Sequence, residues 1–188
     1  MTGTPRPEPY DIAAIAARIA RPVVLVGLMG VGKSTVGRKL ASLLDRNFVD
    51  ADDAIAQAAG RSIPEIFETF GEAHFRDGER RVIARLMDEA HGVIATGGGA
   101  FVDPATRALV LDRAIAVWID CDVDTLVERT SRRNTRPLLK NGNAREILTR
   151  LTEERTPFYA QAHIRVISET GPHGDTARAI LEAIDQWL

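Results

Sequence analysis

The sequence predicts an α/β fold, a five-stranded parallel sheet with helices on both faces. Short apolar runs rich in Val and Ile alternate with longer segments whose apolar residues recur at helical spacing. A glycine-rich stretch, 27–35, joins the first apolar run to a helix. Aspartates or glycines directly follow several of these runs, which is the position where ligands bind in parallel sheets.

Length and composition indicate one ordinary globular domain. The chain has 188 residues, of which 45% are hydrophobic and 27% charged, and its net charge is −2. This balance argues against a general nucleic-acid or membrane-binding surface. A single cysteine, Cys121, excludes an internal disulfide and fits a reducing cytosol. We expect a disordered tail at 1–10, a single domain at 11–188, and a cytoplasmic monomer without nucleic-acid or membrane partners.

Local signals place the elements of the first half of the chain. Asp11 is expected to cap a short helix, because an aspartate can accept from the free amides of the first turn. Ser62 and Glu65 have the spacing of a capping box, and Gly60 and Gly71 end or break helices. We expect helices at 12–19, 36–44, 54–59, 63–70 and 72–90, and strands at 21–26 and 47–49.

The second half of the chain continues the alternation. Asp103 and Pro104 are an N-cap and a proline in the first helical position. Another helix is expected to start at Asp122 or Asp124. The remaining strands are expected at 93–95, 114–119 and 164–167, and the remaining helices at 144–154 and 176–188.

Residues 27–35, here named the phosphate loop, fit the pattern G-x-x-x-x-G-K-[ST] at every fixed position. Its glycines let backbone amides surround a polyphosphate, and the helix that follows adds a favourable dipole. Lys33 can reach the β- and γ-phosphates, and the hydroxyl of Ser34 can ligate Mg²⁺. The sequence therefore predicts an ATP and Mg²⁺ site; the expected nucleotide-binding residues are Gly30, Val31, Gly32, Lys33, Ser34 and Thr35.

Two of the expected strands end in a carboxylate that can bind Mg²⁺. These carboxylates are Asp50 and Asp120. The third strand ends in Thr96 and Gly97 instead, which weakens an interpretation as a motor ATPase or GTPase switch. Asp50 and Asp52 are two apart on chain expected to be extended, so one can face the metal and the other an acceptor hydroxyl. The alternative is that both aspartates cap the helix that begins near residue 53.

Three consecutive glycines, 97–99, follow a strand and are candidates for an anion-binding nest, the alternative being a flexible connection. Arg76 and Arg155 each lie near an expected helix end and can clamp a carboxylate with a bidentate fork. The polar segment at about 130–143 carries several arginines and is expected to close as a lid over the nucleotide. Its alternative is a solvated basic loop.

These motifs together resemble the shikimate kinase family, whose members have the nucleoside-monophosphate-kinase-like form of the P-loop NTPase fold. The resemblance covers about residues 23–167 in the family's order. One departure is the loop 168–172, which lacks the arginine that family members often carry near the adenine. The matching segments are 27–35, 48–52, 60–63 with 66–67, 71–72 with 75–76, 97–100, 134–139, and Arg155 with Pro157 and Tyr159.

The resemblance implies transfer of the γ-phosphoryl of ATP to the 3-hydroxyl of shikimate, with the substrate region at about 50–80. It implies Lys33, Asp52 and Arg136 as catalytic residues, with Lys33 and Arg136 at the transferring phosphate. Arg129 aligns with an arginine that contacts adenine. Shikimate would be held by Asp52, Arg76, Gly98 and Arg155 with Gly97 and Gly99 beside them, and Mg²⁺ by Ser34 and, through water, Asp50.

Three other functions stay open. A gluconate-type sugar-acid kinase shares the phosphate loop and an anionic polyol acceptor. A nucleotide-binding regulator would lack the acceptor residues, whereas this sequence has Asp52, Arg76 and Arg155. A nucleoside-monophosphate kinase needs a base-recognition motif that the sequence does not show. The four histidines fit no metal spacing and are interpreted as structural or exposed.

Overall fold

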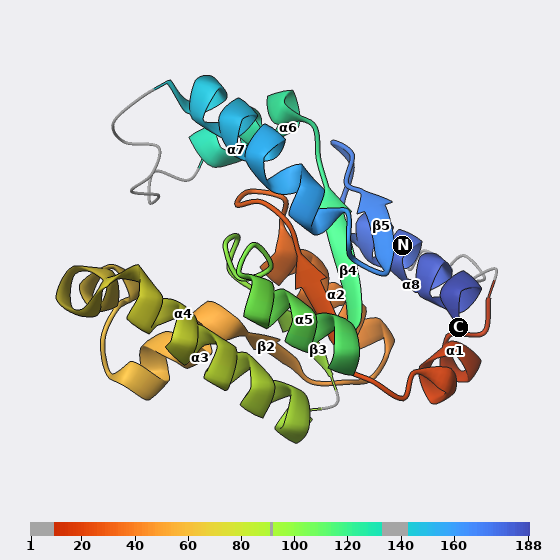
Figure 1. Ribbon diagram of the computed structural model, residues 1–188. Helices are drawn as coiled ribbons and strands as arrows, with labels where there is room; N and C mark the ends of the chain where they lie inside the picture. Colours follow the sequence, from red (N-terminus) through yellow and green to blue (C-terminus); the bar gives the residue numbers. More distant parts are fainter. Residues whose placement is uncertain (1–9, 91, 133–142) are drawn as a thin grey trace, which may run out of the picture.

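A computed structural model describes residues 10–90, 92–132 and 143–188 (Figure 1). Five parallel strands form one sheet in the order β2-β3-β1-β4-β5. The strands are β1 (Val23–Val26), β2 (Phe48–Asp50), β3 (Val93–Ala95), β4 (Ile115–Asp120) and β5 (Ile164–Ile167). The predicted fold class is confirmed. The expected tail at 1–10 lies, apart from residue 10, outside the described residues.

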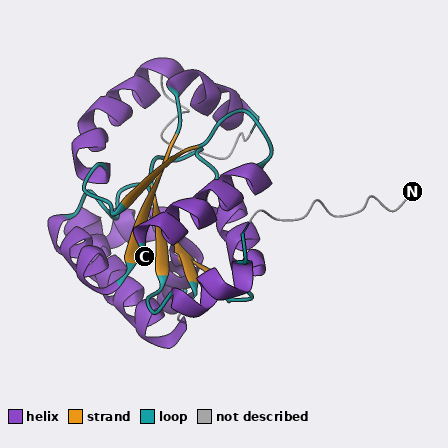
Figure 2. Ribbon diagram, turned by 90° about the vertical axis from the view of Figure 1, so that its right-hand side faces the viewer, coloured by secondary structure: helices purple, strands orange, loops and turns teal. Residues whose placement is uncertain are grey.

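Helices cover both faces of the sheet (Figures 1 and 2). Within the described residues, α2 packs beside α8, and α4 beside α3 and α5. The centre of the sheet is buried, because the β1 side chains have no exposed surface. The helices are α1 (Ile12–Arg18), α2 (Lys33–Leu43), α3 (Ala51–Ala59), α4 (Ile63–Ala90), α5 (Pro104–Arg113), α6 (Val123–Ser131), α7 (Ala144–Tyr159) and α8 (His173–Trp187).

Several predicted caps are present. Asp11 accepts from the amide of Ala14 at 3.1 Å, and Glu65 accepts from the amide of Ser62 at 2.7 Å, as the capping box requires. Gly71 has φ 79° and ψ 174°, so it breaks the helical path inside α4 where the sequence predicted a break. Asp122 caps α6 and accepts from the amide of Thr125.

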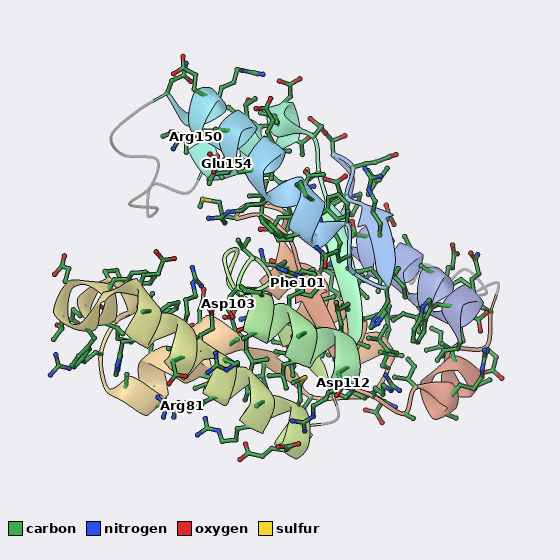
Figure 3. The ribbon with its side chains drawn as sticks, in the orientation of Figure 1. Arg81, Phe101, Asp103, Asp112, Arg150 and Glu154 are labelled. Carbon is green, nitrogen blue, oxygen red and sulfur yellow. The ribbon has the colours of Figure 1, made fainter. Side chains whose placement is uncertain are left out.

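Several helix boundaries differ from the prediction; α2, for example, begins at Lys33 and not at residue 36. α3 begins at Ala51, because Asp50 itself is its N-cap, so Asp52 lies in the first helical turn and not on extended chain. α7 continues through Pro157 to Tyr159, although the sequence predicted an end at Glu154 (Figure 3). α8 begins at His173 instead of Thr176. Apolar packing at Tyr159, which is buried, outweighs the proline in α7.

A small second core joins α3 to α4. Ile55 of α3 packs with Ile66 and Phe75 of α4, separate from the main core. The rings of Phe67 and Phe75 are 4.4 Å apart. This cluster fixes α3 against both segments of α4, and so places the side chains that α3 and α4 direct toward the sheet edge.

Parallel strands bring their carboxyl ends to one edge. The phosphate loop follows β1, Asp50 ends β2, and Thr96 follows β3. Since β1, β2 and β3 are neighbours in the sheet, these three ends lie together. Thr96 joins two of them, because its amide and hydroxyl donate to the carbonyl of Leu25 at 3.1 and 2.9 Å.

The described residues contain no helix with the length and apolarity that a membrane span requires.

Candidate active site

The phosphate loop wraps around the ammonium group of its own lysine. Lys33 begins α2, and its Nζ donates to the carbonyls of Gly27 and Leu28 at 2.7 and 2.8 Å. Gly32, its N-cap, has φ 93°, a conformation that glycine adopts without strain. The positive end of the α2 dipole and the Lys33 charge therefore converge on one concave backbone segment, which suits a polyphosphate.

Ser34 and Asp50 form the oxygen-rich side of the site. The Ser34 hydroxyl donates to Oδ2 of Asp50 at 2.5 Å, while Oδ1 of Asp50 accepts from the amide of Asp52 at 3.0 Å. The rival carboxylate, Asp120, is bound by Arg165, whose Nη2 lies 2.6 Å from Oδ2. This pairing favours Asp50 over Asp120 as the carboxylate that serves a metal.

Asp52 projects from the first turn of α3 toward the edge of the sheet. Burial, followed by the nearby charge of Asp50, raises the pKa of this carboxyl, and Lys33 and Arg76 oppose the rise. A carboxyl whose pKa is raised in this way, and which lines a cavity together with Lys33, is a candidate for a functional position.

Residues 97–99, here named the glycine floor, lie beneath the three predicted acceptor side chains. A methyl group on Gly97 would stand 2.8 Å from Oδ1 of Asp52, and one on Gly98 would stand 3.2 Å from Nη1 of Arg155. A methyl group on Gly99 would overlap the guanidinium of Arg76. The structure thus brings together Asp52, Arg76 and Arg155, which are far apart in the sequence, around a backbone that has no side chains.

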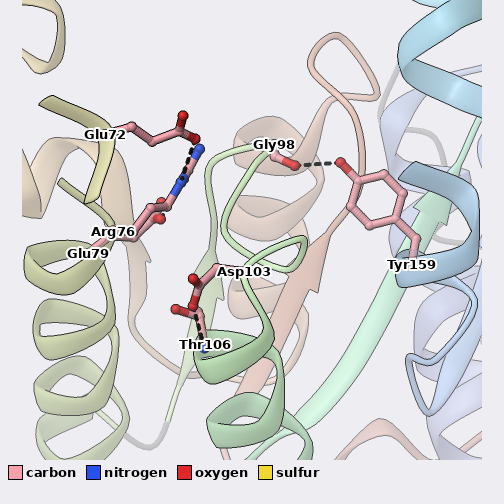
Figure 4. Close-up of polar contacts among 7 residues, drawn as sticks. All are labelled: Glu72, Arg76, Glu79, Gly98, Asp103, Thr106 and Tyr159. Carbon is pink, nitrogen blue, oxygen red and sulfur yellow. Dashed lines mark hydrogen bonds and ion pairs between the residues drawn. The ribbon is translucent and has the colours of Figure 1, made fainter. Parts of the chain in front are cut away.

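A buried carboxylate that the sequence analysis missed holds Arg76. Glu79 is 1% exposed, and its Oε2 accepts from Nη1 of Arg76 at 2.6 Å (Figure 4). Glu72, one turn before Arg76, lies 3.5 Å from its Nε. Burial raises the pKa of Glu79, and the charge of Arg76 opposes this. Arg76 and Glu79 are three residues apart in the helix, and this spacing indicates that their side chains can form an ion pair.

Arg129 connects the phosphate loop to the chain after β5. Its Nη1 donates to the carbonyl of Val31 and to the Ser168 hydroxyl, both at 3.1 Å, and its Nη2 donates to the carbonyl of Glu169 at 2.6 Å. The loop 168–172, which departs from the family pattern, therefore contributes acceptors that hold an arginine from α6.

His173 was interpreted as structural or exposed, but it lines the site. A methyl group on Gly32 would stand 2.8 Å from its Cε1, so the imidazole lies against the phosphate loop. His173 lies 141 residues after Gly32 in the sequence. No local pattern predicts that the two residues are in contact. Of the expected lid at about 130–143, Thr130 and Ser131 end α6 and Asn143 caps α7, while 133–142, with Arg136, lie outside the described residues.

One cavity of about 1010 Å³ joins these groups. It runs from the phosphate loop and His173 across Asp52 to α3 and the start of α4. Gly99 of the glycine floor does not line the cavity, and neither do Arg76 and Arg155, which lie beside that floor. The predicted site residues that line it are Gly30, Gly32, Lys33, Ser34, Thr35, Asp50, Asp52, Gly97, Gly98 and Arg129.

A loop with the polyphosphate-binding pattern shares a cavity with Asp52, and Arg76 and Arg155 lie against the neighbouring glycine floor. This arrangement is typical of a small-molecule kinase of the P-loop class. The family model described as shikimate kinase matches residues 29–185. The chain belongs to the shikimate kinase family.

Individual relatives agree with this membership. A shikimate kinase of Novosphingobium aromaticivorans is 66% identical over 95% of this chain and 94% of its own length. The solved shikimate kinase of Acinetobacter baumannii in complex with shikimate is 40% identical, with a TM-score of 0.82 over 88% of this chain and 93% of its own. A gluconokinase of Sinorhizobium meliloti has a TM-score of 0.61 over 90% of this chain and 94% of its own, but 15% identity, so it shares the fold alone.

Proposed function

We propose that this enzyme transfers the γ-phosphoryl group of ATP to the 3-hydroxyl of shikimate, giving shikimate 3-phosphate and ADP, on the route to chorismate and the aromatic amino acids. The observation that carries the proposal is the glycine floor, with Asp52 on one side and the guanidinium groups of Arg76 and Arg155 on the others. Shikimate has one carboxylate, which complements the two guanidinium groups, and several hydroxyls, which complement the carboxylate of Asp52.

The acceptor is held at two points. Arg76 and Arg155 offer forked donors to its carboxylate, and the absence of side chains at 97–99 lets both guanidinium groups lie against the backbone of the glycine floor. Asp52 accepts the hydrogen of the 3-hydroxyl or orients that hydroxyl, since the carboxylate lies in the same cavity as the phosphate loop. Fixing the hydroxyl in line with the γ-phosphorus is the main requirement of phosphoryl transfer.

The phosphate loop supplies charge stabilisation. Lys33 is 9% exposed, and its ammonium donates to two carbonyls of the phosphate loop, which fix its position there. A preorganised positive charge in a site from which water is excluded stabilises the charge that develops on the transferring group. Arg129 is proposed to face the adenine. Arg136 is proposed to reach the γ-phosphate, on the resemblance alone.

The oxygen donors at Ser34 and Asp50 fit Mg²⁺, which prefers hydroxyl, carboxylate and water oxygens. Ser34 would bind the ion directly and Asp50 through water. When bound, Mg²⁺ neutralises charge on the β- and γ-phosphates. We also propose a cytoplasmic monomer, for which the lone buried Cys121 fits a reducing compartment.

A screen of acceptors tests the proposed function. The purified enzyme is given ATP and Mg²⁺ with shikimate, gluconate or a nucleoside monophosphate, and ADP release and the phosphorylated product are measured. We expect transfer to shikimate, and none in a folded Lys33→Ala variant. Preference for gluconate would favour the sugar-acid kinase, and ATP binding without transfer to any acceptor would favour a regulator.

A further inference from the structure

Tyr159 connects α7 to the glycine floor. Its side chain is 1% exposed, and its ring lies 6.0 Å from that of Trp118. The hydroxyl donates to the carbonyl oxygen of Gly98, and Figure 4 shows the side chain reaching from α7 to that oxygen. The mechanism described above makes no use of this buried hydroxyl.

This hydrogen bond fixes the direction of a peptide group that adjoins the acceptor site. In a trans peptide, the carbonyl of Gly98 and the N–H of Gly99 point in opposite directions. Since Tyr159 holds the carbonyl on its own side, the Gly99 amide faces the other side, where Arg76 lies against Gly99 (Figure 4). Within the described residues, this amide has no hydrogen-bond partner in the protein.

The same region of α7 is clamped at a second point. Nη1 of Arg107 donates to the carbonyls of Phe101 and Val102 at 3.1 and 3.0 Å, and its Nε donates to Oε1 of Gln161 at 3.1 Å. The segment after the glycine floor is therefore attached to the turn that follows α7 as well. The alternative of a flexible connection at 97–99 is not favoured by these contacts.

Arg155 and Tyr159 are four residues apart on α7 and so lie on the same helical face. Both reach Gly98: Arg155 lies close to its α-carbon, and Tyr159 binds its carbonyl oxygen. α7 therefore fixes both the position of Arg155 and the orientation of the peptide group between Gly98 and Gly99.

We propose that Tyr159 is a positioning residue for the acid acceptor: by holding the Gly98 carbonyl, it aims the Gly99 amide at the acceptor carboxylate beside Arg76 and Arg155. This inference rests on the proposed function. Burial raises the pKa of Tyr159, so its hydroxyl keeps the proton that it donates across the physiological pH range.

The test is Tyr159→Phe, which keeps the ring in the core and removes only the hydroxyl. We expect the KM and the directly measured Kd for shikimate to rise about tenfold, the size typical of one lost hydrogen bond. The KM for ATP is expected to stay within about twofold, because the phosphate loop does not contact this hydroxyl. The penalty should shrink for shikimate methyl ester, which lacks the charge that the amide would bind.

Thr156→Val is the matched control, because the Thr156 hydroxyl donates within α7 to the carbonyl of Thr152 at 2.7 Å. It should leave the KM for shikimate unchanged. All variants are compared at a temperature where thermal melts show them folded. An unchanged shikimate Kd in Tyr159→Phe, or equal penalties for the acid and its ester, would overturn the role of Tyr159 but not the proposed function. No transfer to shikimate by the unmodified enzyme would overturn the proposed function.

Discussion

The carboxylate of Asp52 lies directly against the backbone of Gly97. A methyl group on the α-carbon of Gly97 would stand 2.8 Å from Oδ1 of Asp52, closer than side chains tolerate. The first turn of α3 and the chain leaving β3 therefore meet with no space for a side chain between them. Glycine at 97 is a requirement of this approach.

Gly97→Ala tests that relationship. The added methyl group should push the Asp52 carboxylate away from the acceptor hydroxyl, and kcat should fall by about 10²-fold, since small displacements from an in-line geometry have effects of that order. Steady-state kinetics with shikimate and ATP measure it. The matched control is Gly78→Ala, because a methyl group on Gly78 of α4 meets nothing within 4 Å. A loss of similar size in both variants would contradict the assignment.

Asp52→Asn should lower the turnover of the enzyme but raise its thermal stability. Turnover is expected to fall by about 10²-fold or more, with ATP binding little changed, because the group that accepts or orients the hydroxyl proton is lost. Thermal stability at pH 7 should instead rise, because burial and the charge of Asp50 make the ionised carboxylate unfavourable in the folded protein. Kinetics, nucleotide titration and thermal melts measure the three quantities.

The pH dependence of that stability difference follows from the direction of the pKa shift. The folded protein holds the Asp52 proton more tightly than the unfolded chain, whose ordinary pKa is 3.8. Stability therefore falls as pH rises from about the unfolded pKa through the raised folded pKa. The advantage of Asp52→Asn should be present at pH 7 and disappear in acid. An advantage that grows in acid, or a less stable variant at pH 7, would show that the carboxylate is stabilised in the fold.

His173→Ala should affect the nucleotide side of the reaction alone. The imidazole lies against Gly32 and lines the cavity next to Arg129, so its loss should raise the KM for ATP by about two- to tenfold. The KM for shikimate should not change. His74→Ala is the control, because His74 is exposed and stacks on Phe70, at 4.7 Å between ring centres. If His173→Ala changed only the shikimate KM, the nucleotide assignment would be wrong.

Local patterns predicted most of the fold and much of the site. The phosphate loop and the capping aspartates are defined by residues close together in the sequence, so a single sequence specifies them. The start of α3 was misplaced because Asp50 both ends a strand and caps a helix. The end of α7 was misplaced because burial of Tyr159 is a tertiary effect that outweighs Pro157.

Contacts between distant residues could not be predicted in this way. Glu79 is recognisable as a partner of Arg76 by helical spacing, but its burial depends on how α4 packs. The bonds from Arg129 to Val31 and Ser168, and the approach of His173 to Gly32, join segments that are far apart in the sequence. Only the folded sheet edge brings such pairs together.

The most direct test of the central claim compares kcat/KM for shikimate and shikimate methyl ester in the unmodified enzyme, Arg76→Lys and Arg155→Lys. A lysine keeps the charge at each position but cannot form the forked contact with a carboxylate. We predict that both substitutions weaken the use of shikimate strongly, and that esterification costs the unmodified enzyme far more than either variant. An equal loss on esterification in all three enzymes would contradict an acid acceptor held by these two arginines over the glycine floor.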